Sequence, residues 1–219
     1  MMSFNRSVFL KAIAGVLLAA GSASVALAQS SPAPDDPTRV VQDAAEGMLK
    51  DLEANRDAYR KDPSKVSALV EKWLLPSFDT QKAARTVLGR HWRTATDDQK
   101  KRFVDAFYQS LLRNYGSALV EFTSDRMKIL PAQVDADGVN ATVRTEIKRS
   151  NGTRIPVYYR LSKGSDGKWK AWDVVIEGIS YVKSFRDDFG AEIDQKGIDA
   201  VIERMEKGGK PTAAPGTSS

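Results

Sequence analysis

The sequence predicts an α+β fold in which a helical layer packs on a curved, mainly antiparallel sheet of four strands. In residues 37–122 apolar side chains recur about every 3.6 positions, the spacing of amphipathic helices. From residue 124 the period changes to two, and glycine-containing turn dipeptides separate the runs, which is typical of a hairpin meander. In residues 168–189 a strand rich in aromatic and β-branched residues leads into a helical pattern after Gly178, so this stretch joins the two layers.

Four helices are expected before the first strand. Each expected start has a residue that caps helix N-termini well, followed by proline at two of the starts and by a glutamine three positions later at another. These expected caps are Asp36, Asp62, Asp79 and Thr96. The fourth helix is the longest, and its apolar stripe is wide enough to face more than one neighbour.

The first long hairpin has a register that the sequence constrains. Residues 139–147 and 155–161 both alternate apolar and polar side chains. A three-residue loop at 150–152 places the two apolar sets on one face, whereas a two-residue loop would place them on opposite faces. We therefore expect the three-residue loop, which pairs Ile147 with Ile155 and Val143 with Tyr159.

The last hairpin and the segments after it complete the expected fold. A four-residue loop at 164–167 would pair Tyr159 with Trp172 and Val157 with Val174. Gly178 ends this strand, and a helix is expected to follow at once from Ile179. A final helix opens at Gly197.

The N-terminus has the features of a cleaved export signal. Arg6 and Lys11 form a basic start, residues 12–20 are apolar, and Ala-Leu-Ala at 26–28 is a small-x-small cleavage pattern. An uncleaved anchor is the alternative, but a bilayer span needs about 20 apolar residues. The expected division of the chain is a signal peptide at 1–28, a disordered leader at 29–36, one folded domain at 37–207 and a disordered tail at 208–219.

Composition restricts the classes of function. The chain has no cysteine, so it forms no disulfide and no cysteine-containing metal site. The whole chain has 33 basic and 28 acidic residues, and loss of Arg6 and Lys11 with the signal leaves 31 against 28, a net charge of +3. This mild positive charge fits contact with anionic headgroups or an acidic partner, and a nucleic-acid role is not expected for an exported chain.

Few residues are suited to covalent chemistry. His91 is the only histidine, no glycine-rich phosphate loop is present, and no metal site is expected. Asp173 and Glu177 are the best candidates for a general acid or base, since a carboxylate in a dry cleft has a raised pKa. The alternative for both is a hydrogen-bonded structural carboxylate, because no catalytic partner is identifiable.

Four stretches carry a resemblance to a known family: residues 74–115, IPVYYRL at 155–161, WKAWDVVIEGISYVKSFRDDF at 169–189, and GIDAVI at 197–202. Their order and spacing after an export signal resemble those of the MlaC-type periplasmic phospholipid-binding proteins, also known as the toluene-tolerance auxiliary family. The resemblance spans most of the mature chain.

The resemblance implies a fold related to the NTF2-like architecture, with an apolar lipid pocket in the domain at 37–207. It implies binding and transfer of phospholipid without covalent chemistry and without a cofactor other than the bound lipid. Such proteins are monomers in the periplasm that carry lipid between an outer-membrane lipoprotein–porin complex and an inner-membrane MCE-domain ABC transporter, which maintains the lipid asymmetry of the outer membrane. The alternatives are a small-molecule enzyme that uses Asp173 and a periplasmic chaperone.

A carrier of this kind needs a dry interior. At about 0.8 kcal/mol per methylene, exposing two acyl chains to water would cost on the order of 20 kcal/mol. Periodicity selects the residues expected to line that interior: Trp73, Leu75, Phe78, Phe103, Phe107, Leu111, Tyr115, Val143, Val157, Tyr159, Trp172, Val174, Ile176, Ile179 and Tyr181.

A surface for partners is also expected. The densest group of basic residues consists of Arg90, Arg93, Lys100, Lys101 and Arg102. It is a candidate docking surface for acidic partners or headgroups, with a simple solvated helix face as the alternative.

Overall fold

A computed structural model describes residues 35–62, 64–120, 123, 126–148 and 151–209, with only the backbone of Ser117 and Ala118. The chain divides into Met1–Ser31, which lies outside the described residues, and Pro32–Ser219, which contains all the described elements. The expected signal peptide at 1–28 therefore lies outside the described residues, as do most of the leader at 29–36 and of the tail at 208–219.

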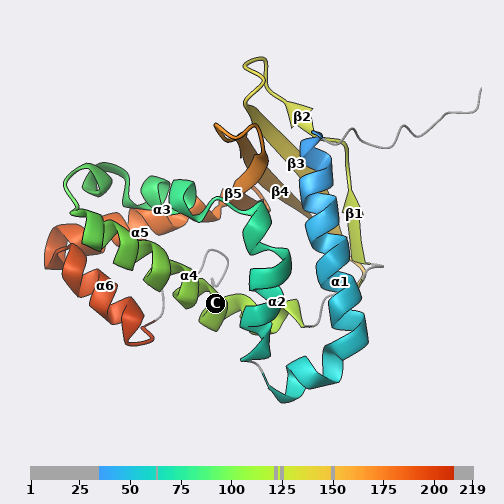
Figure 1. Cartoon of the computed structure of the whole chain (residues 1–219), viewed down its shortest axis with the longest axis horizontal. Coiled ribbons are helices and arrows are strands. Elements are labelled where there is room, and N and C mark those ends of the chain that lie inside the picture. The colour runs from blue at the N-terminus through green and yellow to red at the C-terminus, as the bar shows by residue number, and fades with distance from the viewer. Residues whose placement is uncertain (1–34, 63, 121–122, 124–125, 149–150, 210–219) are drawn as a thin grey trace, which may run out of the picture. The chain divides into compact units, whose positions relative to one another are not determined.

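The described residues form six α-helices and an antiparallel sheet (Figure 1). The helices are α1 (Pro37–Lys61), α2 (Lys65–Trp73), α3 (Thr80–Leu88), α4 (Asp97–Leu119), α5 (Tyr181–Lys196) and α6 (Ile198–Glu206), with 3-10 turns η1 (Leu75–Ser77) and η2 (Gly89–Arg93). The strands are β1 (Met127–Ile129), β2 (Gln133–Val134), β3 (Asn140–Lys148), β4 (Arg154–Lys163), β5 (Trp169–Ile176) and β6 (Ile179–Ser180). The predicted α+β fold is confirmed, with six strands in place of four.

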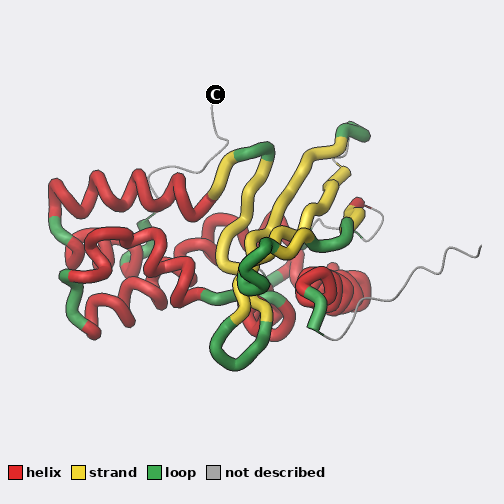
Figure 2. The backbone as a smooth tube through the Cα atoms, turned by 90° about the horizontal axis from the view of Figure 1, so that it is seen from above, coloured by secondary structure: helices red, strands yellow, loops and turns green. Residues whose placement is uncertain are grey.

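The sheet has the order β1-β3-β4-β5-β6, and β2 also pairs with β3. Figure 2 shows the strands lying side by side, with helices next to them. The segment expected to form one first strand is divided into β1 and β2, which pair with successive parts of β3. Pro131 lies between them, and a proline has no backbone N–H to donate to the ladder. The second additional strand, β6, comes from the turn after β5.

Most of the predicted helix starts are confirmed. Asp36 accepts a hydrogen bond from the backbone N–H of Thr38 at 2.7 Å, and Thr96 forms the predicted capping box with Gln99, with contacts of 3.2 and 2.9 Å. Asp79 caps α3 in the same way, at 2.8 Å from the N–H of Lys82. The Asp62 prediction is wrong, because its carboxylate binds Ser64 and α2 begins only at Lys65.

The predicted register of the first long hairpin is confirmed, and the predicted register of the last hairpin is wrong. In the first, Ile147 pairs with Ile155 and Val143 with Tyr159. In the last, Val174 lies opposite Tyr159 and Ile176 opposite Val157. The loop is one residue longer than expected, since Lys163 pairs with Trp169, and a bulge opposite Arg160 and Leu161 adds a second residue. The bulge also brings Ala171 onto the same face as Val174, which simple alternation does not predict.

The segment before α3 docks at this bulge. Phe78 forms an isolated parallel bridge with Ala171, and the N–H of Asp79 donates to the carbonyl of Ala171 at 2.7 Å. The helical part and the sheet are thereby joined in the middle of β5.

The chain turns back once more before α5 begins. Glu177 and Gly178 have φ angles of 50° and 85°, which suits a two-residue hairpin loop between β5 and β6. Ser180 then caps α5 by accepting from the N–H of Lys183 at 3.0 Å. The helix thus starts two residues later than expected, and Ile179 lies in the edge strand.

Asp173 connects β5, β6 and the start of α5. Its carboxylate is fully buried and accepts from the Ser180 hydroxyl at 2.7 Å and the Val182 N–H at 3.1 Å. The guanidinium of Arg160 lies 3.2 Å away. Asp173 is therefore a hydrogen-bonded structural carboxylate.

Replacing Asp173 should destabilise the fold. In Asp173→Ala the Ser180 hydroxyl and the Val182 N–H lose their buried acceptor, so we expect a loss of about 3 kcal/mol in the free energy of unfolding. Urea denaturation measures it. The control is Asp187→Ala, an exposed position on α5, where a change below about 0.5 kcal/mol is expected. Equal effects of the two variants would contradict the structural role.

The contact between α1 and α2 depends on a glycine. A Cβ atom at Gly47 would lie 2.0 Å from Cε3 of Trp73, so only glycine allows the indole to pack there. Gly190, in α5, has open space around the same position.

Two glycine-to-alanine variants should therefore change stability in opposite directions. Gly47→Ala forces the Trp73 indole away and should cost about 1–3 kcal/mol. Gly190→Ala should stabilise by about 0.5–1 kcal/mol, because alanine favours a helix interior. Thermal unfolding measures whether each variant is more or less stable than the wild type. Stabilisation by Gly47→Ala would contradict the close contact between Gly47 and the Trp73 ring.

Candidate functional site

A cavity of about 550 Å³ lies among the helices and the inner face of the sheet. Helix α4 supplies Val104, Phe107, Tyr108, Leu111, Leu112, Tyr115, Gly116 and Leu119. The strands supply Met127, Ile147, Ile155, Val157, Tyr159, Ala171, Val174 and Ile176. The remaining lining residues come from α1, from α2 and the segment 74–78 after it, and from the starts of α3 and α5.

None of the 29 described residues that line this cavity carries a charge. Its polar members are Ser77, Thr80 and four tyrosines. A cavity with so apolar a lining stays dry when empty, because water inside it would lack hydrogen-bond partners. It therefore suits an apolar ligand.

The four tyrosines do not supply a base. Burial raises the pKa of the phenols of Tyr108, Tyr115, Tyr159 and Tyr181, so they are neutral at physiological pH. The rings of Tyr115 and Tyr181 meet edge to face with centroids 6.3 Å apart. This geometry supports binding of a ligand rather than proton transfer to it.

The structure brings ten of the fifteen predicted lining residues together on the cavity wall. They are Leu75, Phe78, Phe107, Leu111, Tyr115, Val157, Tyr159, Val174, Ile176 and Tyr181. Their contact with a ligand stays a prediction.

Phe103 and Val143 lie outside the cavity wall and are enclosed by side-chain packing. Phe103 is fully buried between Phe107 and Phe189, with ring centroids at 5.8 and 5.7 Å. Val143, also fully buried, packs in a cluster with Val41. Periodicity places both on the apolar side of their element but does not distinguish a packed core from a cavity.

Trp73, Trp172 and Ile179 also lie outside the wall. The Trp73 ring covers Gly47, Trp172 lies at the bulge with the Lys82 ammonium 4.9 Å from its ring, and Ile179 is 47% exposed. The bulge and the β5–β6 turn, which the sequence analysis did not predict, account for the last two.

Sequence reasoning missed nineteen of the 29 lining residues, and α1 and α4 supply five of these each. The five on α1 are Val40, Val41, Ala44, Ala45 and Met48. The apolar stripe of this helix is visible in the sequence, and its small residues are the signal for space beside it. Nothing in the stripe itself shows that it faces a cavity.

The catalytic candidates lie outside the cavity wall. Asp173 is on the opposite face of the sheet, Glu177 is in the exposed β5–β6 turn, and His91 is in η2 with its Nε2 3.4 Å from Asp194. The enzyme alternative thus lacks its base in the cavity. Among the described residues, no group of three His, Cys, Asp or Glu could hold a metal ion.

The predicted basic cluster consists largely of residues with acidic neighbours. Arg102 makes a two-pronged contact with Glu206 at 3.0 and 2.8 Å, Lys100 pairs with Asp97 at 3.1 Å, and Arg90 pairs with Asp194. Arg93 and Lys101 are exposed. The cluster lies in η2 and the first turns of α4.

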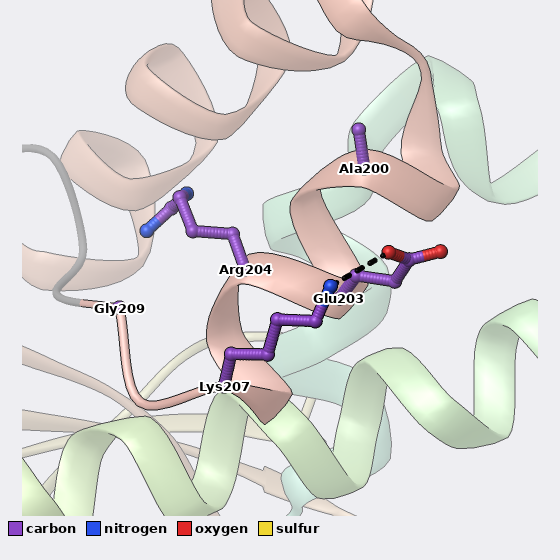
Figure 3. A pocket seen from close by; sticks show the side chains of 5 residues that line it. All are labelled: Ala200, Glu203, Arg204, Lys207 and Gly209. Carbon is purple, nitrogen blue, oxygen red and sulfur yellow. Dashed lines mark hydrogen bonds and ion pairs between the residues drawn. The ribbon is translucent and has the colours of Figure 1, made fainter.

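A second, polar depression of about 460 Å³ lies at the end of α6 (Figure 3). Its lining is Ala200, Glu203, Arg204, Lys207 and Gly209, and Lys207 pairs with Glu203 at 3.2 Å. The depression is formed by one helix and the residues after it, and it lacks the apolar lining of the larger cavity.

Asp51 fixes the wall formed by α1 and α2. Its carboxylate accepts from the Trp73 indole at 3.0 Å, the Tyr59 hydroxyl at 2.8 Å and the Lys72 ammonium at 3.0 Å. The hydrogen bonds from Trp73 and Tyr59 hold the pKa of Asp51 well below the ordinary range of an aspartate.

The Asp51 contacts should stabilise the protein at neutral pH and weaken in acid. A lowered folded-state pKa contributes stability above the unfolded value of about 3.9, which is lost as the pH falls below it. The stability difference between the wild type and Asp51→Asn should therefore narrow from pH 7 to pH 3, as measured by urea denaturation. Asp43→Asn, an exposed change on the same helix, should stay within about 0.5 kcal/mol of the wild type throughout. A constant Asp51→Asn difference would contradict this assignment.

The fold and the cavity define an α+β protein whose interior suits an apolar ligand. The sequence model described as "MlaC protein" matches residues 42–207. The chain belongs to the MlaC family.

Two relatives and one solved structure agree with this assignment. The toluene tolerance protein ttg2D of Pseudomonas putida is 33% identical over 164 residues, which cover 74% of this chain and 75% of the relative. The intermembrane phospholipid transport system binding protein MlaC of Haemophilus influenzae is 26% identical over 184 residues, or 83% and 84% of the two chains. The phospholipid-binding protein of Ralstonia solanacearum, solved in complex with a phospholipid, has a TM-score of 0.70 at 24% identity and covers 78% of this chain and 96% of its own. This likeness shows the fold.

Within the described residues, no helix has the length and apolar character needed to cross a bilayer.

Proposed function

We propose that this protein is a periplasmic carrier that binds the acyl chains of a phospholipid in its internal cavity. The observation that carries the proposal is the 550 Å³ cavity with 29 lining residues, none of them charged among the described part of the chain. Acyl chains need a surrounding of this kind, because each methylene exposed to water costs about 0.8 kcal/mol. Relatives whose names include phospholipid transport and phospholipid binding support the choice of ligand.

The cavity volume sets a scale for the ligand. If a methylene group takes about 30 Å³, the share of a water molecule in the liquid, then 550 Å³ corresponds to about 18 such groups. This leaves room for at least one long acyl chain.

The activity proposed is binding and transfer, without covalent chemistry. The cavity lining supports this proposal, since neutral tyrosines are its only titratable groups among the described residues. We further propose that the carrier moves lipid between an outer-membrane lipoprotein–porin complex and an inner-membrane MCE-domain ABC transporter, as the family assignment implies. Both the export signal at 1–28 and the monomeric state are parts of this proposal.

Native mass spectrometry tests the proposal directly. The mature protein, purified from the periplasm without detergent, should carry a stoichiometric adduct of phospholipid mass, mixed in headgroup because the chains are what is held. Lipid extraction from the same sample identifies the adduct. A clean apo mass with no extractable lipid would overturn the carrier assignment.

Filling the cavity should reduce the amount of bound lipid. Val174→Trp places an indole among the lining residues, so the adduct should fall to less than about half of the wild-type level, since larger side chains take up the ligand's space. The matched control is Val139→Trp, at a position 48% exposed and outside the lining, which should keep its lipid. Full lipid occupancy in a folded Val174→Trp protein would show that lipid binds elsewhere.

A further inference from the structure

The face of the sheet opposite the cavity concentrates positive charge. Strand register places six basic residues on it: Lys128, Arg144, Lys148, Arg154, Arg160 and Lys170. Met127 and Ile147 form one pair of the ladder and line the cavity, so their neighbours Lys128 and Lys148 point to the other side. We call these six residues the basic face.

Acidic residues do not balance this charge. Glu146 is the one accessible acid that the register places there among the described residues, and it lies 3.8 Å from Arg154. Asp173 shares this side of the sheet, but it is fully buried and occupied by Ser180 and Val182 as well as Arg160. The side chains of Arg154 and Arg160 are still 51% and 48% exposed.

The arrangement of cations works against the stability of the sheet. Lys148 and Arg154 lie directly opposite each other on adjacent strands, a like-charge pair that is unfavourable in an isolated sheet. Arg144 is exposed and lies over the ring of Tyr158, with its guanidinium carbon 5.6 Å from the centroid. A partner that supplies negative charge at this place would offset the repulsion between the two cations.

The basic face differs in this respect from the cluster in η2 and α4. There, Arg90, Lys100 and Arg102 have carboxylates of the same chain beside them. On the sheet, Lys128, Arg144 and Lys148 have no ion pair among the described residues.

We propose that the basic face docks an acidic protein surface, through carboxylates that its arginines bind. A guanidinium presents a planar fork that fits a carboxylate with two hydrogen bonds. A lipid bilayer fits the face less well, because a bilayer lying on it would be separated from the cavity by the whole sheet. A protein docked there leaves the cavity side of the molecule free.

The test uses the full mature chain and a synthetic oligoglutamate peptide, followed by backbone amide shifts in NMR spectra. The face variant is Arg144→Glu, Lys148→Glu and Arg154→Glu together. The matched control is Arg93→Glu, Lys101→Glu and Lys183→Glu, which changes the net charge equally at exposed positions elsewhere. Vesicles of phosphatidylglycerol and phosphatidylethanolamine form the second arm.

We expect the peptide to change the backbone amide shifts of β1, β3 and β4. The face variant should weaken the Kd for the peptide about tenfold or more, and the control variant should change it less than about twofold. Shifts centred on η2 and α4, or equal losses in both variants, would overturn the proposal. Binding to vesicles that depends on the face, without binding to the peptide, would also overturn it in favour of a membrane contact. Native mass spectrometry of the face variant separates this result from the carrier proposal, since its bound lipid should be unchanged.

Discussion

The fold depends on keeping an apolar cavity open between packed clusters. A cavity costs stability in proportion to its volume, because the atoms around it lack partners. The chain meets this constraint by packing its apolar residues in separate groups: α3 to α6 around four phenylalanines, the sheet with α1, and α1 with α2 and α4. The cavity lies where these groups meet, and an apolar ligand would restore the missing contacts.

Three carboxylates join neighbouring elements of the fold. Asp51 joins α1 to α2, Asp173 joins β5 to α5, and Glu192 accepts from Arg204 at 2.9 and 2.7 Å to join α5 to α6. Each carboxylate uses most of its acceptor capacity. Its hydrogen bonds therefore fix the relative orientation of the elements that it joins, which apolar packing alone does not do. None of the three lines the cavity, and none of the described residues that do line it is charged.

The two faces of the sheet differ in chemistry. Alternation along β3 and β4 gives the cavity face its valine, isoleucine and tyrosine side chains and the opposite face its arginines and lysines. A ligand on one face and a partner on the other can be held at the same time. This separation follows from the two-residue period of a strand.

The sequence by itself determined the element order, the helix caps at Asp36, Asp79 and Thr96, and the register of the β3–β4 hairpin, because these depend on neighbouring residues. It also indicated seven of the sixteen lining residues on α4 and the strands, since periodicity identifies the apolar side of an element. Only the tertiary structure decided that Phe107 reaches the cavity and Phe103, in the same packed cluster, does not, because that choice depends on the helices across from α4. The bulge in β5 was decided in the same way, since it forms where Phe78, distant in sequence, docks against Ala171.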